Sequence, residues 1–267
     1  MKDKEKKITS SITYSCYADI IMEGENFIRS HVLSCLISGN QEVMIGNKSY
    51  QFKEGDIRFF KKNQLAKFVK RPSSSGQFKT ITIHLDDAIL REISKDETML
   101  PAVPYSGEHN LVLKSSNLLK NFIGSLSPYM DPGIVHSEVL TAIKVKEAIY
   151  VLIETNPSLK GLLFDFSEPH KIDLEAYINE HYKFNIDLES MAYLTGRSLS
   201  TFKRDFQVLF NQTPSRWIQQ RRLMEANLLI NEKKMRPRDI YMDLGFVDFS
   251  HFSFAYKKAF GKSPTIK

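Results

Sequence analysis

A segment near the C-terminus of the chain repeats after 50 residues, so that Ser198–Pro214 aligns with Asp248–Pro264. In both copies aromatic residues recur at every fourth position, which places them on one face of a helix, and mostly polar and basic residues fill the opposite face. The aromatic positions are Phe202, Phe206 and Phe210 in the first copy and Phe252, Tyr256 and Phe260 in the second. The sequence therefore predicts the same small helical unit twice, with these rings, and Trp217, in the core.

A short helix and a glycine turn precede the first aromatic helix. Asp187 is the expected N-cap of a helix from Leu188 to Thr195, because its carboxylate can accept hydrogen bonds from the free backbone N–H groups. The helix ends at Gly196, and Ser198 is the expected cap of the helix that follows.

The second copy has the same parts. Pro237 begins a helix that ends at Gly245, and Asp248 caps its successor. Each copy closes with a hydroxyl residue and a proline, which is typical of the start of another helix: Thr213-Pro214 and Ser263-Pro264. A short helix, a tight turn and a second helix with a polar outer face form a helix-turn-helix. A plain helical hairpin with a solvated charged face would fit one copy, but two copies at nearly the same spacing favour the helix-turn-helix.

Basic residues concentrate in this repeat region. Residues 171–267 carry 16 Lys and Arg against 11 Asp and Glu, whereas residues 1–170 carry 21 against 20. From Arg197 to Arg238 there are ten basic residues and three acidic ones. Such a field suits a phosphate backbone, because binding to it is driven largely by the release of its counterions.

The stretch from Ile186 to Pro264 resembles the DNA-binding domain of AraC/XylS-type transcription regulators, in which a long helix joins two helix-turn-helix units. The matching segments are Leu188-Glu-Ser-Met-Ala192, Gly196-Arg-Ser-Leu-Ser-Thr-Phe-Lys-Arg-Asp-Phe206, Pro214 with Trp217, Arg222-Leu223 with Ala226, Gly245-Phe246, Ser250-His-Phe252, and Phe260-Gly261 with Pro264. The resemblance implies a sequence-specific transcription regulator that binds double-stranded DNA. Because most members of this family activate transcription, the resemblance also implies that the protein is an activator. An activator of this type is expected to contact RNA polymerase as well as DNA.

The resemblance also assigns roles to residues of this chain. Residues expected to face base edges in the major groove are Ser200, Lys203 and Arg204 in the first unit and Ser250, His251 and Phe254 in the second. Expected phosphate contacts are Thr201, Gln207, Arg221, Arg222 and Lys257. Arg204 is the strongest candidate, because a guanidinium can bridge O6 and N7 of guanine. The alternative for Arg204 is a phosphate contact or a solvated charge.

The first part of the chain predicts a different fold. Residues 8–85 contain short alternating segments separated by glycine turns, which are typical of a small β-barrel or sandwich. The expected strands are Ile28–Ser38, Gln41–Ile45, Ser49–Phe52, Asp56–Phe60, Leu65–Val69 and Lys79–Leu85. This pattern is similar to the cupin-like regulatory domain of many AraC-type proteins. The expected fold class is therefore α+β: a cupin-like β-barrel with helices, followed by an all-α double helix-turn-helix domain.

Two helices are expected after the barrel, at Ser115–Leu126 and His136–Glu154. The second is apolar around much of its circumference, which fits either burial within one chain or packing on the barrel and on a partner subunit of a homodimer. Asn156–His170, with prolines near its ends, is the expected linker. We therefore expect a regulatory or dimerisation domain at 1–155, a linker at 156–170 and a DNA-binding domain at 171–267.

Several classes of protein are disfavoured. The charged segment Met1–Lys7 lacks a signal-peptide core and no apolar run reaches the length of a membrane span, so we expect a soluble cytoplasmic protein without a membrane partner. Cys16 and Cys35 are expected to be buried thiols. The barrel segment has only His31 and His84, far apart, so no metal or other cofactor is expected. Phosphate-binding glycine loops, nucleophile elbows and the Pro-Cys-His context of AraC-type repair proteins are absent, so we expect no enzyme and no catalytic residue.

Two alternatives stay open. The first is an architectural protein that binds DNA with little sequence preference. The second is a regulator whose N-terminal domain responds to a protein partner and not to a small-molecule effector.

Overall fold

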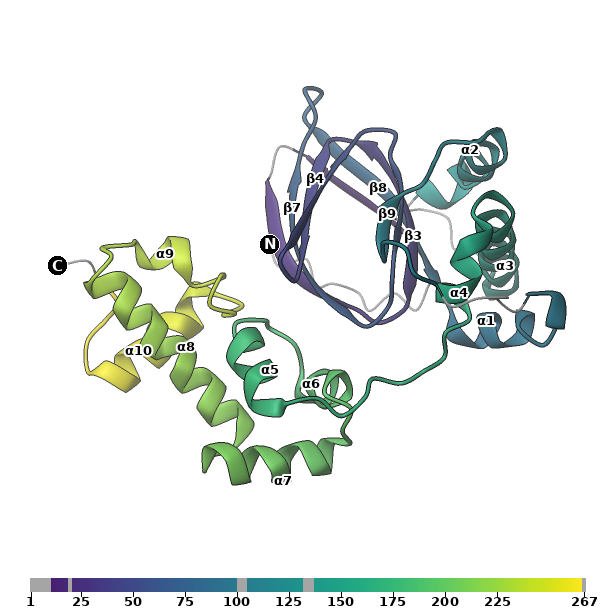
Figure 1. Ribbon diagram of the computed structural model, residues 1–267. Helices are drawn as coiled ribbons and strands as arrows, with labels where there is room; N and C mark the ends of the chain where they lie inside the picture. Colours follow the sequence, from purple (N-terminus) through teal and green to yellow (C-terminus); the bar gives the residue numbers. More distant parts are fainter. Residues whose placement is uncertain (1–10, 19–20, 100–104, 132–136, 266–267) are drawn as a thin grey trace. The chain divides into compact units, whose positions relative to one another are not determined.

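The computed structural model describes residues 11–18, 21–99, 105–131 and 137–265. They divide between Phe166 and Ser167 into two compact units (Figure 1). The segment at residues 1–7 and the expected helix start at His136 lie outside the described residues.

The N-terminal unit contains two antiparallel β-sheets that enclose an apolar interior (Figure 1). In spatial order, the five-stranded sheet consists of β1 (Ile12–Ala18), β8 (Gln77–Leu85), β3 (His31–Ser38), β6 (Ile57–Phe60) and β9 (Asn110–Val112). The four-stranded sheet consists of β2 (Met22–Ile28), β7 (Gln64–Arg71), β4 (Asn40–Ile45) and β5 (Lys48–Lys53). Five of the six expected strands are confirmed with shifts of one or two residues at their ends; the sixth, expected from Ile28, begins only at His31, because Ile28 is the last residue of β2.

Alternate side chains of the five-stranded sheet build two cores, because successive residues of a strand point to opposite faces. Inward-facing residues such as Val32, Leu36 and Phe60 join Val43 and Phe52 of the other sheet. Outward-facing residues of the same sheet pack with the helical part of the unit, in a cluster that includes Leu33, Phe59, Ile81, Ile83, Val145, Ile149 and Leu152. Figure 1 accordingly shows the helices on one side of the barrel.

The helices of this unit are α1 (Asp87–Ile93), α2 (Asn117–Gly124), α3 (Glu138–Thr155) and α4 (Lys160–Leu163). The two predicted helices correspond to α2 and α3. Burial within one chain does not account for all apolar residues of α3, because one face of the helix is exposed; it carries apolar residues together with Glu147 and Glu154. Its large exposed apolar residues are Val139 (69%), Leu140 (55%), Ile143 (54%) and Tyr150 (46%).

The expected linker began too early. Residues 157–163 form a short 3-10 turn and α4, and Leu159, Leu162, Leu163 and Phe164 are buried in the core of the N-terminal unit. The extended segment that follows runs from residue 165 to residue 173. Prolines at both ends suggested a loop, but the apolar residues between them pack on the barrel's helices.

The C-terminal unit is helical. It consists of α5 (Leu174–His181), α6 (Leu188–Leu194), α7 (Leu199–Phe210), α8 (Pro214–Asn231), α9 (Pro237–Ile240) and α10 (Phe249–Phe260). Two apolar clusters share the long helix α8: Ile218 packs with α5, α6 and α7, and Leu223, Ala226 and Ile230 pack with α9 and α10. No helix within the described ranges is long and apolar enough to span a bilayer.

Of the two thiols, Cys35 is buried as expected, whereas Cys16 is exposed. Cys16 lies on β1, which is the edge strand of its sheet, so only one neighbouring strand covers it.

Candidate nucleic-acid interface

The first helix-turn-helix consists of α6 and α7, and the predicted caps hold it. Asp187 Oδ1 accepts a hydrogen bond from Ser190 N at 2.7 Å, and Ser198 Oγ accepts one from Thr201 N at 3.3 Å. Gly196 has φ +66°, and a Cβ there would lie 2.4 Å from the carbonyl carbon of His170. Only glycine fits this turn, because a side chain would be strained and would collide with backbone.

The second helix-turn-helix is less regular. The predicted helix from Pro237 to Gly245 is wrong in length: α9 ends at Ile240, and residues 241–245 form turns. Gly245 has φ +81°, and a Cβ there would lie 2.2 Å from Lys183 O. Asp248 Oδ1 accepts a hydrogen bond from His251 N at 2.7 Å and caps α10 as predicted.

The aromatic residues of the repeat lie in the core as predicted. Phe202, Phe206, Phe252 and Tyr256 are almost fully buried. The last ring of each helix is half-buried and extends the aromatic cluster, with Phe206–Phe210 centroids 4.4 Å apart and Tyr256–Phe260 centroids 4.6 Å apart. Trp217 lies 4.5 Å from Phe210, centroid to centroid, and attaches α8 to the first unit.

Opposite the aromatic face, α7 presents its candidate DNA contacts together. Ser200, Lys203, Arg204 and Gln207 are all exposed. Their spacing of three, four and seven residues places them on one face of the helix. Thr201 is half-buried beside them, and its hydroxyl accepts a hydrogen bond from Ser198 Oγ at 3.0 Å.

The outer face of α10 is chemically different. Ser250, His251, Phe254 and Lys257 are exposed, and Phe254 is 70% exposed. A phenyl ring so open to water has no role in the core of this unit. The face combines a hydroxyl, an imidazole and one apolar ring with flanking lysines.

Arg222, one of the expected phosphate contacts, binds backbone carbonyls within the protein. Its Nε donates to Tyr182 O at 2.8 Å, its Nη1 to Gly245 O at 2.7 Å and its Nη2 to Phe184 O at 2.9 Å. These bonds tie α8 to the turn after α5 and to the turn of the second helix-turn-helix. The guanidinium is therefore a structural clamp, whereas its neighbour Arg221 is exposed.

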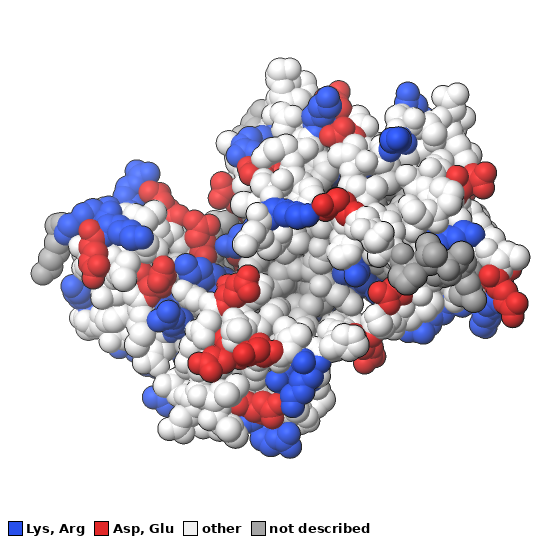
Figure 2. Space-filling model, viewed as in Figure 1, with Lys and Arg blue, Asp and Glu red and all other residues white. Residues whose placement is uncertain are grey.

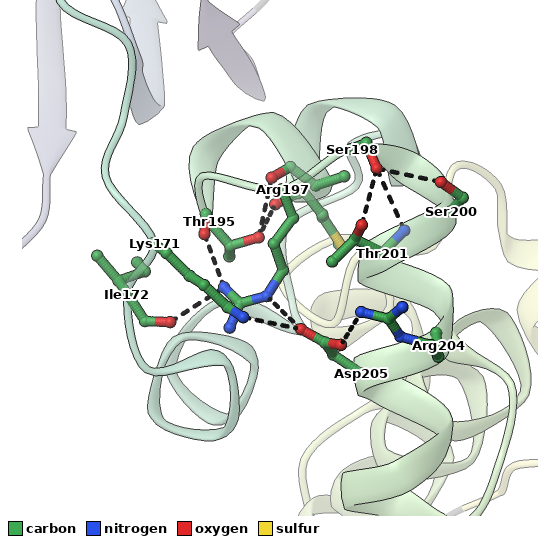
Figure 3. A network of polar contacts seen from close by, with 11 residues as sticks. Lys171, Ile172, Thr195, Arg197, Ser198, Ser200, Thr201, Arg204 and Asp205 are labelled. Atoms are coloured by element: carbon green, nitrogen blue, oxygen red, sulfur yellow. Dashed lines mark hydrogen bonds and ion pairs between the residues drawn. The ribbon is translucent and has the colours of Figure 1, made fainter.

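A polar network behind α7 was not predicted (Figure 3). Arg197 is nearly buried and donates from Nε to Asp205 Oδ2 at 3.1 Å. Arg204 Nη2 lies 3.4 Å from Asp205 Oδ1, and Lys171 Nζ lies 3.5 Å from Asp205 Oδ2. The hydrogen bond from Arg197 is the main cause that lowers the pKa of Asp205. The only hint of this network in the sequence is a single acidic residue, Asp205, next to two basic residues of α7.

Charges of both signs are interspersed on the face of the molecule that Figure 2 draws. Figure 2 shows Lys and Arg next to Asp and Glu on the face drawn, so the basic excess does not form a single continuous patch there. Among the described residues, no group of three or more His, Cys, Asp or Glu side chains could hold a metal ion.

Two family models match the chain. A model described as a helix-turn-helix domain matches residues 191–266, and one described as the ExsA N-terminal regulatory domain matches residues 31–162. One match lies in each of the two units of the structure.

Similar proteins include several regulators. The thermoregulatory protein LcrF of Yersinia pestis is 26% identical over 246 residues, covering 87% of each chain. The virulence regulon transcriptional activator VirF of Yersinia enterocolitica is 26% identical with the same coverage. The regulatory protein SoxS of Escherichia coli K12 is 32% identical over 93 residues, covering 35% of this chain and 87% of SoxS. Among solved structures, apo ToxT from Vibrio cholerae has a TM-score of 0.47 and 11% identity over 96% of each chain.

Proposed function

The chain belongs to the AraC/XylS family of DNA-binding transcription regulators, which are not enzymes, and from that premise we propose that α7 and α10 read DNA sequence in the major groove. One observation carries the proposal. In both helices the aromatic face is buried, while the opposite face, which holds the candidate contacts, is exposed.

The two helices take different roles in this proposal. Ser200, Lys203 and Arg204 read the first half-site, and Arg204 bridges a guanine. Ser250, His251 and Phe254 read the second half-site, where Phe254 offers an apolar contact to a thymine methyl group. Phosphate contacts by Thr201, Gln207, Arg221 and Lys257 fix the register of the protein on the duplex.

We further propose a cytoplasmic activator that contacts RNA polymerase. The similarity to VirF, which is named a transcriptional activator, supports activation over repression. The C-terminal unit binds DNA in this account, and the N-terminal regulatory domain receives the signal.

A salt titration of the full-length protein with duplex DNA tests the DNA-binding role. We expect the logarithm of the binding constant to fall by about 0.9 per phosphate contact for each tenfold rise in salt concentration. Binding that does not weaken with salt would contradict phosphate contacts by these residues.

A specific observation favours a protein partner for the N-terminal unit. The exposed face of α3 carries Val139, Leu140, Ile143 and Tyr150, and adjacent exposed apolar residues on one helix mark interaction sites. We propose that this face joins two copies of the chain in a homodimer. A small-molecule effector remains the alternative signal, and sedimentation of the full-length protein with and without DNA tests the dimer.

A further inference from the structure

Asp205 uses its two carboxylate oxygens differently. Oδ2 contacts Arg197 Nε at 3.1 Å and Lys171 Nζ at 3.5 Å, while Oδ1 faces Arg204 Nη2 at 3.4 Å (Figure 3). The carboxylate is 21% exposed, the side chain of Arg197 only 7%, and that of Arg204 74%. Asp205 therefore lies between a nearly buried cation, Arg197, and a solvent-exposed one, Arg204.

The anchor on the inner side is rigid. Besides Asp205, Arg197 binds two backbone carbonyls, with Nη1 donating to Thr195 O at 2.7 Å and to Ile172 O at 3.0 Å. Arg197 directly follows the Gly196 turn, so the helix-turn-helix geometry fixes where its guanidinium lies. A carboxylate held by such a guanidinium is a fixed acceptor, because moving it would break charge-assisted hydrogen bonds.

The chain segment that enters the C-terminal unit is part of the same arrangement. Ile172 N donates to Thr195 O at 3.4 Å, and the Gly196 turn approaches the backbone of His170 closely. Lys171, between these two residues, reaches Asp205. Arg197 and Lys171 offset part of the negative charge of Asp205, and with it part of the repulsion between this acid and a nearby phosphate.

We infer that Asp205 is a positioning residue for DNA recognition: its Oδ1 orients the guanidinium of Arg204 toward a base. The inference rests on the proposed role of Arg204 in base reading. An exposed arginine side chain loses conformational entropy when it binds DNA. A carboxylate that already holds the guanidinium in place lowers this entropy cost of binding. Asp205 thus favours specific binding although its charge disfavours DNA.

The two effects of Asp205 have opposite signs, which makes the inference testable. Removal of an acid from a DNA-binding surface by itself strengthens binding to any duplex. Removal of a positioning residue weakens binding to the preferred site. A matched control is Asp239 on α9, whose carboxylate lies 2.7 Å from Nε of Arg236, the N-cap residue of that helix, in an exposed pair.

The experiment measures the affinity of full-length Asp205→Ala, Asp205→Asn, Asp239→Ala, Arg204→Ala and the Arg204→Ala/Asp205→Ala double variant. The ligands are the duplex that the wild-type protein selects from random DNA and a scrambled duplex. Asp205→Ala should weaken binding to the selected duplex roughly 3- to 30-fold, as expected for coupled neighbours, and strengthen binding to the scrambled one. Asp205→Asn, which keeps an acceptor oxygen, should retain part of the preference, and Asp239→Ala should not weaken selected-site binding.

The double variant distinguishes an effect of Asp205 on the position of Arg204 from an effect of Asp205 on the stability of the fold. In the Arg204→Ala background the additional loss caused by Asp205→Ala should fall below about 2-fold, since no guanidinium is left to position. An equal loss in both backgrounds would assign Asp205 a structural role and overturn the inference. So would an Asp205→Ala variant that binds the selected duplex as tightly as wild type while Arg204→Ala binds weakly. If Arg204→Ala itself binds normally, the proposed function fails and not only the positioning role.

Discussion

At the scale of single residues, neighbours in the sequence have opposite roles. Arg221 and Arg222 are adjacent on α8, and the family resemblance predicts a phosphate contact for both. Arg222 instead donates to three backbone carbonyls that lie 23 to 40 positions away in the sequence. Its partners are non-local, so no pattern around Arg222 predicts them.

Replacement of the two arginines should separate stability from DNA affinity. Arg222→Met should lower the free energy of unfolding by about 2–4 kcal/mol, because it leaves hydrogen-bonding carbonyls without their donor. Arg221→Met should change stability by less than about 0.5 kcal/mol and reduce the salt dependence of DNA binding by about one phosphate contact. Denaturant unfolding and salt titrations measure both effects. Equal stability of the two variants would contradict the clamp role of Arg222.

At the scale of elements, the repeat was predicted well because its signals are local. The caps Asp187, Ser198 and Asp248 and the glycine turns act within a few residues, and the structure confirms them. The second unit deviates where its first helix ends at Ile240, before the turn glycine. In the N-terminal unit, the sequence did not predict strands β1, β2 and β9, which are edge strands of their sheets. The sequence of β2, with Gly24 between two glutamates, has little strand preference of its own, and β2 forms because it pairs with the distant strand β7.

The network around Asp205 could not be derived from sequence either. Its members come from the entering segment, the turn and the recognition helix, and only the fold brings Lys171 to α7. The exposed residues of α7 and α10 were predictable, because a helix that buries its aromatic face in the core exposes its opposite, polar face to solvent.

The exposed face of α3 leads to a prediction at the same scale. If the chain forms the proposed homodimer, Ile143→Asp should convert it to monomer, because the variant introduces a charge into the proposed apolar contact. Asn121→Asp adds the same charge on the exposed surface of α2 and serves as the control. Analytical ultracentrifugation of both variants measures the outcome. A wild-type chain that is monomeric at all concentrations, or an Ile143→Asp variant that dimerises normally, would refute this face as the interface.

At the scale of the whole molecule, two units with different chemistry share one chain. The N-terminal unit has an apolar surface on α3, whereas the C-terminal unit carries the basic excess and two polar helix faces. Regulation then requires that a signal received by the N-terminal unit changes how the C-terminal unit binds DNA. The segment from residue 165 to residue 173 is the covalent connection, and its Lys171 contacts the acid next to Arg204.

In the proposed function, two chemically unequal helices read the DNA sequence. A binding selection on randomised duplex DNA tests this proposal most directly, with full-length wild type, Arg204→Ala and Phe254→Ala. Wild type should select a motif with two half-sites. Arg204→Ala should cost about 1–3 kcal/mol and relax one or two positions of the first half-site. Phe254→Ala should cost less and weaken an A·T preference in the second half-site. Selection of no motif by wild type would indicate an architectural DNA-binding protein, and loss of a guanine preference only in Phe254→Ala would contradict the roles assigned to the two helices.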